Sequence, residues 1–228
     1  MDNTISMILI CAVSGYIVGC INLAFFLAKL KGFDIREHGS GNAGASNIII
    51  TMGKGLGVAV ALVDIFKAFL IIRLVMHIYP ENAVLSGFVC ATFVVIGNIF
   101  PFYMGFKGGK GFASLGGSVL ALDAKLFVVL LIIVAVIVFL SDYICFGPMF
   151  ASVAFPLSYG VMNSTYIPSV FTVATFAIIY RHLENIRRIT QGKELRLSFL
   201  WNRKREVDRL GIENDDGKNY PFEHDNKA

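Results

Sequence analysis

The sequence predicts an all-α integral membrane protein, a bundle of seven transmembrane helices. Of its 228 residues, 56% are hydrophobic and 16% are charged, whereas soluble domains average about 25% charged residues. The charges are also uneven, because 20 of the 36 Asp, Glu, Lys and Arg residues follow Tyr180. The apolar stretches do not alternate polar and apolar residues as the strands of a membrane barrel do, so we expect helices in lipid.

Apolar runs of transmembrane length follow one another along the first 181 residues. An apolar helix of about 20 residues crosses the roughly 30 Å hydrocarbon core of a bilayer. The fourth run is short and rich in glycine and serine, so we expect it to be tilted, enclosed by its neighbours, or incomplete. The predicted spans are residues 5–29, 55–78, 83–103, 111–122, 125–141, 144–162 and 165–181.

The first run is interpreted as a transmembrane helix and not as a signal peptide. No basic stretch precedes it, and it is too long for a signal core. Lysine and arginine gather after the first, third and seventh spans, and such residues favour the cytoplasmic side. This pattern places the N-terminus outside and the C-terminus in the cytoplasm. It also brings three unusual polar segments to the cytoplasmic face of the membrane.

The first polar segment, residues 38–47, interleaves glycine with serine and asparagine. Glycines in such a loop allow several backbone N–H groups to point into one concavity. Ahead of a helix that begins near Ser46 or Asn47, the loop would form an anion-binding cradle. A flexible turn between two spans is the alternative interpretation. The candidate binding residues here are Ser40, Asn42, Gly44, Ser46 and Asn47.

The second polar segment, residues 106–111, places Lys107 and Lys110 on either side of a Gly-Gly pair. Two lysines and free backbone donors at a membrane edge can bind a phosphate. A positive-inside anchor is the alternative, and it would explain the lysines but not the four glycines around them.

The third polar segment begins at Arg181 and follows the last predicted span. If that helix continues, His182 and Asn185 lie at i and i+3 and share one face. A basic cluster that binds anionic lipid headgroups is the alternative. Asp64 and Lys67 add two charges within a span, where they are either functional or a self-neutralising ion pair. Together the segments predict a pocket at the cytoplasmic membrane edge for a partly lipidic, phosphate-bearing molecule.

These motifs resemble those of a known family. GSGNAGASN with DIFKA, FPFYMGFKGGKG and RHLENIRRITQGKE are similar, in order and spacing, to the conserved stretches of the bacterial acyl-phosphate:glycerol-3-phosphate acyltransferases. The resemblance covers residues 5 to about 194 and implies a multi-pass protein of the bacterial cell membrane. It implies acyl transfer from acyl phosphate to the 1-hydroxyl of sn-glycerol 3-phosphate, giving lysophosphatidic acid and phosphate. The expected partners are these two substrates and the lipid bilayer, with no nucleic acid, no metal and no cofactor.

The resemblance also assigns roles to individual residues. The first segment would hold the phosphate of the acyl phosphate, with Lys110 nearby. Lys107, Lys110, Arg181, His182 and Asn185 would engage glycerol 3-phosphate, with Gly109 and Gly111 beside them. Among these, His182, Asn185 and Lys110 are the candidate catalytic residues. His182 is the side-chain candidate for general base, and a phosphate oxygen of a substrate is the alternative.

Four positions depart from the family pattern: Ile50 stands where the family has an arginine, Asn98 where it has a histidine, and Cys145 and Pro148 where it has serines. Loss of one charged phosphate partner costs about 1.5–3 kcal/mol. The sequence therefore indicates a divergent member. It leaves open a different acceptor, or a weak or silent paralogue that binds a phosphate ligand or partners an active copy. A transporter is disfavoured, because no internal repeat is detectable.

The charge distribution divides the chain into a membrane-embedded domain, residues 1–194, and a charged cytoplasmic tail, residues 195–228. Within the tail, residues 195–210 place apolar side chains among arginine and lysine, a pattern typical of an interfacial helix. The remainder is polar enough to be disordered.

Overall fold

A computed structural model describes residues 2–202, 205–206 and 209. Among these residues every regular element is helical, and no strand is present, so the predicted all-α class is confirmed. The helices are α1 (Asp2–Cys20), α2 (Leu23–Leu30), α3 (Ala45–Met52), α4 (Lys54–Ile78), α5 (Ala83–Ile99), α6 (Phe112–Leu122), α7 (Ala124–Ser141), α8 (Phe146–Met162) and α9 (Thr172–Thr190). Short 3-10 helices are η1 (Ile35–Glu37), η2 (Pro80–Asn82), η3 (Phe102–Met104), η4 (Ile167–Phe171) and η5 (Leu197–Leu200).

The outer surface of this bundle is apolar. Three helical stretches in the described part are long and apolar enough to cross a membrane, namely Asn3–Leu30, Pro80–Met104 and Ala124–Ser141. Large apolar side chains such as Phe66 and Phe139 are exposed along the helices. Water disfavours such a surface and lipid does not. The protein is therefore an integral membrane protein, as the composition predicts.

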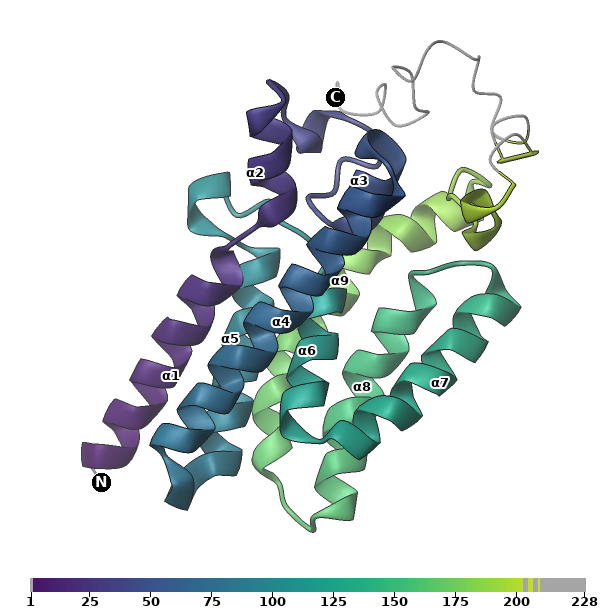
Figure 1. Ribbon diagram of the computed structural model, residues 1–228. Coiled ribbons are helices and arrows are strands. Elements are labelled where there is room, and N and C mark those ends of the chain that lie inside the picture. Colours follow the sequence, from purple (N-terminus) through teal and green to yellow (C-terminus); the bar gives the residue numbers. More distant parts are fainter. Residues whose placement is uncertain (1, 203–204, 207–208, 210–228) are drawn as a thin grey trace.

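Close contact between α1 and α5 depends on glycine. A Cβ atom at Gly15 would lie 2.6 Å from the carbonyl oxygen of Cys90, and one at Gly19 would lie 2.3 Å from that of Val94. Small residues let two helix backbones approach in this way, which is a common packing mode in membranes. Figure 1 shows α1 in purple running beside α5 and α4, with α7 and α8 in the other half of the bundle.

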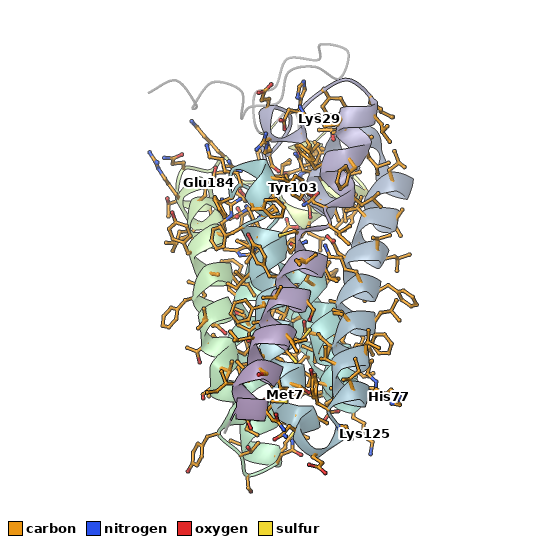
Figure 2. All side chains as sticks on the ribbon, turned by 90° about the vertical axis from the view of Figure 1, so that its left-hand side faces the viewer. Met7, Lys29, His77, Tyr103, Lys125 and Glu184 are labelled. Carbon is orange, nitrogen blue, oxygen red and sulfur yellow. The ribbon has the colours of Figure 1, made fainter. Side chains whose placement is uncertain are left out.

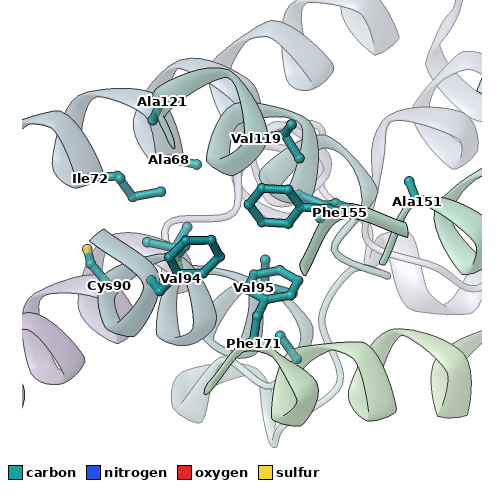
Figure 3. Close-up of a cluster of buried hydrophobic side chains, with 14 of the residues drawn as sticks. Ala68, Ile72, Cys90, Val94, Val95, Val119, Ala121, Ala151, Phe155 and Phe171 are labelled. Carbon is teal, nitrogen blue, oxygen red and sulfur yellow. The ribbon is translucent and has the colours of Figure 1, made fainter. Parts of the chain in front are cut away.

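An aromatic cluster joins α5, α8 and η4, the short helix before α9, at the centre of the bundle. The rings of Phe88 and Phe155 are stacked with their centroids 5.4 Å apart, and Phe155 meets Phe171 edge to face at 5.3 Å. All three side chains are fully buried. Figure 3 shows Phe155 and Phe171 close to Val94 and Val95 of α5. This packing fixes the relative positions of the helices whose ends carry the polar segments.

The first predicted span, residues 5–29, is not one continuous helix, because the helix breaks between Cys20 and Leu23. Polar side chains satisfy the backbone groups that the break frees. The side chain of Asn22 accepts a hydrogen bond from Phe25 N–H at 2.8 Å and donates one to the Ala43 carbonyl at 2.9 Å. Lys67 donates to the carbonyls of Gly19 and Ile21 and also pairs with Asp64 at 2.6 Å.

Two other predicted boundaries differ. The third span, predicted as 83–103, has its regular helix end at Ile99, because a proline follows at 101 and disfavours a helical conformation in the residue before it. The last helix runs on to Thr190, well past the predicted end at residue 181. This extension confirms that His182 and Asn185 share a helix.

The polar loops gather at one end of the bundle. In Figure 2, Lys29, Tyr103 and Glu184 lie at one end, whereas Met7, His77 and Lys125 lie at the other. Of the predicted interfacial helix, residues 195–210, the structure describes residues 195–202, 205–206 and 209, and the remaining positions lie outside the described part. The described residues contain η5 and helical backbone at residues 205–206 and 209. The boundary at residue 194 stays a prediction, although the segment after it lies against the bundle.

Candidate active site

A cavity of about 360 Å³ opens among the polar segments at this end of the bundle. All three segments contribute to its lining. The predicted site residues that line it are Ser40, Asn42, Gly44, Ser46, Gly109, Lys110, Gly111, His182 and Asn185. Asn47, Lys107 and Arg181 are not among its lining residues. The three motifs, far apart in the sequence, therefore meet at one concave site, as the sequence predicts.

Asn47 holds the first loop in place. Its Oδ1 accepts a hydrogen bond from Ser40 N–H at 2.8 Å, and its Nδ2 donates to the carbonyls of Ile35 and His38 at 3.1 and 2.9 Å. Gly39 sits directly beside it with a φ of +60°, and a Cβ there would lie 2.2 Å from the Asn47 Oδ1. The loop is thus built around a buried amide and a glycine that no other residue can replace.

The loop leads into α3, whose N-terminus faces the cavity. Gly44 is the N-cap residue and provides no side chain to cap the helix. The first N–H groups of a helix have no acceptor within the helix. Gly44, Ala45 and Ser46 all line the cavity, so the free N–H groups of the first turn of α3 lie where a ligand could reach them.

The second loop packs directly on the end of α5. Gly108 N–H donates to the Ile99 carbonyl at 3.0 Å, and Gly109 N–H donates to the Asn98 carbonyl at 2.9 Å. A Cβ at Gly108 would lie 2.3 Å from the Asn98 carbonyl oxygen, so only glycine allows this approach. This close packing is a reason for the glycines of the second loop, which a role as a positively charged membrane anchor would not require. It also separates the two lysines, since Lys110 lines the cavity and Lys107 is exposed.

A chain of hydrogen bonds runs through Asn185 on α9. Lys110 Nζ donates to Asn185 Oδ1, and Asn185 Nδ2 donates to Glu194 Oε1 at 2.6 Å. One turn earlier, His182 is buried, and its Nδ1 lies 2.7 Å from the Ile178 carbonyl. Because a carbonyl can only accept, Nδ1 carries the proton, and in the neutral ring Nε2 is then the nitrogen that can accept one.

Glu194 is a site residue that the sequence reasoning missed. It lines the cavity and follows directly after Gly192 and Lys193, at the end of the third motif. Burial raises the pKa of its carboxyl, although the hydrogen bond from Asn185 and the charge of Lys110 oppose this shift. The sequence signal for Glu194 was its position, because it is the acidic residue that closes the third motif after Gly192 and Lys193. A carboxylate there balances the positive charge of Lys110 through the shared amide.

Lys110 is the lysine that lines the cavity, and its ammonium group is largely removed from water. Burial lowers the pKa of its ammonium group to about 8, and the nearby Glu194 and Glu184 partly oppose this effect. An ammonium group with a lowered pKa is stabilised again when an anion binds beside it. The arrangement therefore favours a negatively charged ligand. Arg181 acts elsewhere, because its Nη2 donates to the Gly108 carbonyl at 3.2 Å and fastens α9 to the second loop.

Several polar atoms around the cavity have no partner within the described chain. Asn42 Oδ1, Asn98 Nδ2 and Glu194 Oε2 are buried and make no hydrogen bond to any described residue. An unsatisfied buried polar group costs about 1–3 kcal/mol. Since all three residues line the cavity, a polar ligand would satisfy atoms that the protein leaves unpaired.

The rest of the lining is mostly apolar, although Asp64, Arg188 and Arg196 also belong to it. All four positions at which the sequence departs from the family pattern line the cavity: the apolar Ile50, Cys145 and Pro148, and the polar Asn98. Ile49 and Val58 extend this apolar wall from α3 and α4, and Ile144 extends it from the loop before α8. The cavity therefore has a polar end and an apolar wall. This combination suits an amphiphilic ligand.

Comparison with known proteins gives one consistent result. The family model described as Glycerol-3-phosphate acyltransferase matches residues 9–192. Glycerol-3-phosphate acyltransferase 1 of Oceanobacillus iheyensis is 35% identical over 209 residues, which cover 86% of this chain and 97% of that protein. Glycerol-3-phosphate acyltransferase of Bacillus subtilis is 34% identical over 197 residues, which cover 85% of this chain and all of that protein.

Two solved structures have the same fold. The crystal structure of PlsY, an integral membrane glycerol 3-phosphate acyltransferase, in its glycerol 3-phosphate form matches with a TM-score of 0.75 and 32% identity, covering 85% of this chain and 96% of that chain. The lysophosphatidic acid form of the same protein matches with a TM-score of 0.71 and 31% identity, covering 83% and 94%.

Proposed function

The chain belongs to the glycerol-3-phosphate acyltransferase family, and from this membership we propose that its cavity binds an acyl phosphate and glycerol 3-phosphate side by side. The protein is an acyltransferase of phospholipid synthesis, which transfers an acyl chain to glycerol 3-phosphate and yields lysophosphatidic acid. The donor, the position of the acceptor hydroxyl and the role of each residue are the proposed parts of this function.

One observation carries the proposal. The hydrogen-bonded chain of Lys110, Asn185 and Glu194 meets the N-terminus of α3 in a single cavity that continues into an apolar wall. A phosphate suits the polar end, and a fatty acyl chain suits the apolar wall. Acyl phosphate contains both parts in one molecule.

The reaction needs positioning more than activation. Acyl phosphate is a mixed anhydride, so its carbonyl carbon is electrophilic and its phosphate is a good leaving group. The 1-hydroxyl oxygen of glycerol 3-phosphate attacks this carbon and loses its proton, and the bond between the carbonyl carbon and the phosphate oxygen breaks. The first turn of α3 would hold the departing phosphate, and Lys110 would stabilise negative charge between the two substrates.

His182 is the proposed acceptor of the hydroxyl proton. Its Nδ1 is bound to the Ile178 carbonyl, which orients the ring and leaves Nε2 to act as a base. A phosphate oxygen of either substrate is the alternative base. A His182→Gln variant separates the two, because glutamine can hold a substrate by hydrogen bonding but cannot accept the proton.

We also propose seven membrane crossings in the bacterial cell membrane, with the N-terminus outside. The apolar runs in the sequence support this count, and the gathering of the basic loops at the end that carries the cavity supports the orientation. Accessibility of single cysteines introduced at Lys31 and Lys125 in intact cells would test it. We expect a membrane-impermeant thiol reagent to label the second position and not the first.

A phosphate-release assay tests the function. Purified protein in lipid vesicles is given hexadecanoyl phosphate with and without glycerol 3-phosphate. We expect release that requires glycerol 3-phosphate and falls at least about tenfold in Lys110→Ala, since a lost charged hydrogen bond costs about 1.5–3 kcal/mol. Lys31→Ala is the matched control, because Lys31 is an exposed lysine outside the cavity. The proposal would be overturned if the rate of phosphate release were the same with and without glycerol 3-phosphate. It would also be overturned if the Lys110→Ala variant released phosphate as fast as the wild type.

A further inference from the structure

We propose that residues 195–200, a segment just after the part of the chain that the family model matches, form one wall of the substrate cavity and select the acyl chain. The family model ends at residue 192, yet Leu195, Arg196, Phe199 and Leu200 line the same cavity as Lys110 and His182. This inference rests on the proposed function, because it assigns the segment a contact with the acyl phosphate. We call residues 195–200 the cavity strap.

The cavity strap is anchored on both sides of the cavity. On one side, Leu197 N–H donates to the Asp142 carbonyl at 2.7 Å, and Ser198 N–H donates to the Asp142 carboxylate at 3.0 Å. On the other side, Lys54 at the start of α4 donates to the Leu200 carbonyl at 2.6 Å. The strap therefore runs from the loop between α7 and α8 to the start of α4.

A buried ion pair fixes the start of the strap as well. Glu206 is 1% exposed and pairs with Arg209 at 2.7 Å. Arg209 also donates to the carbonyls of Gly192 and Glu194, each at 2.7 Å. A buried charge is stable only when it is paired and fully hydrogen-bonded. Glu206 also accepts a hydrogen bond from Arg196 N–H at 3.4 Å, so these bonds connect the start of the strap with Glu194 at the polar end of the cavity.

Three apolar residues of the strap line the cavity, namely Leu195, Phe199 and Leu200. Phe199 and Leu200 face the space that Ile49, Ile50 and Val58 line from α3 and α4. An aromatic ring and an isobutyl group have nothing to offer a phosphate, but they contact an acyl chain well. The next residue differs, since Trp201 is 64% exposed and does not line the cavity. The part of the chain that lines the cavity therefore ends at Leu200.

Chain-length preference tests this assignment. We would measure kcat/KM for dodecanoyl, hexadecanoyl and octadecanoyl phosphate with the wild type, Phe199→Ala, Phe199→Leu and Leu200→Ala in lipid vesicles. Because each buried methylene is worth roughly a fourfold change, we expect the preference for the longest chain over the shortest to rise at least about fourfold in Phe199→Ala. Phe199→Leu should give a smaller rise, since it removes less volume. Trp201→Ala is the matched control and should keep the wild-type ratio.

The ratio of two kcat/KM values within one variant does not depend on the fraction of protein that is folded. A variant that folds poorly therefore still reports on selection. Equal ratios in the wild type, Phe199→Ala, Leu200→Ala and Trp201→Ala would overturn the strap as a selecting wall and leave acyl transfer intact. Failure of the wild type to release phosphate with any chain would instead reject the acyl-phosphate donor on which the inference rests.

Discussion

Lys110 Nζ donates a hydrogen bond to Asn185 Oδ1, and this bond joins the glycine-rich loop before α6 to the C-terminal half of α9. The two residues are 75 positions apart in the sequence. Asn185 in turn donates to Glu194, so one amide connects a cation with a carboxylate.

Replacing Asn185 with alanine should disable the site without unfolding the bundle. The change removes the acceptor of Lys110 and leaves the Glu194 carboxyl without its donor. Losing a hydrogen bond to a charged group costs about 1.5–3 kcal/mol, so we expect kcat/KM for glycerol 3-phosphate to fall about tenfold to a hundredfold. The phosphate-release assay measures this change in kcat/KM. Asn163→Ala, at an exposed asparagine far from the cavity, is the control. Equal losses in both variants would contradict a local effect.

The activity should depend on the charge of Lys110 in the alkaline range. The pKa of this lysine is lowered to about 8 by burial, so the charged fraction falls from about nine-tenths at pH 7 to about one-tenth at pH 9. Only the charged form attracts the substrate phosphates. Since kcat/KM reports on the free enzyme, we expect it to fall roughly tenfold over this range.

Lys110→Arg provides the control for that profile. A guanidinium group stays charged throughout this range, so the variant should lose the alkaline fall even if its activity is lower at every pH. A wild-type profile that is flat between pH 7 and 9, or an unchanged fall in Lys110→Arg, would show that another group is responsible.

Lys107 should matter far less than the family resemblance implies. It is exposed and does not line the cavity, and an exposed charge contributes at most about 1 kcal/mol to an interaction. We therefore expect Lys107→Ala to raise KM for glycerol 3-phosphate less than about fivefold. Steady-state kinetics of Lys107→Ala and Lys110→Ala, measured in parallel, would compare their KM values for glycerol 3-phosphate. A loss in Lys107→Ala as large as that in Lys110→Ala would place Lys107 at the substrate after all.

Removing Lys67 should destabilise the bundle. Lys67→Met leaves the buried carboxylate of Asp64 unpaired and frees the carbonyls of Gly19 and Ile21. Breaking a buried ion pair costs about 3–5 kcal/mol, so thermal unfolding in detergent should shift clearly to lower temperature. Adding Asp64→Asn should recover part of this loss. Arg73→Met, at an exposed position on the same helix, should change the unfolding temperature little, and an equal shift there would argue against the pair.

Hydropathy and local spacing predicted most of the helices and the place of the cavity. The i, i+3 spacing of His182 and Asn185 requires only a continuous helix, and α9 provides it. The anion cradle depends on glycines and on the start of a helix, both of which are local features. The sequence was sufficient to predict these features because each of them depends only on residues a few positions apart in the chain.

Contacts between distant segments account for what the sequence did not reveal. The break between α1 and α2 is stabilised by Lys67 and by the bond from Asn22 to Ala43, and neither partner is near in the sequence. Glu194 becomes a site residue only because the chain turns back after α9. Lys107 and Lys110 have the same chemistry, and the packing of Gly108 and Gly109 decides which one faces the cavity.

The amide at position 185 also sets a direction. Its oxygen must face the ammonium group of Lys110 and its nitrogen must face the carboxylate of Glu194, so a side chain with two identical ends cannot serve. Aspartate has nearly the same shape but would set one carboxylate against another, and leucine would leave both partners bare. The longer glutamine would reach its partners only if α9 moved away. Residues of matching size therefore cannot replace Asn185, because this position needs an acceptor on the side of Lys110 and a donor on the side of Glu194.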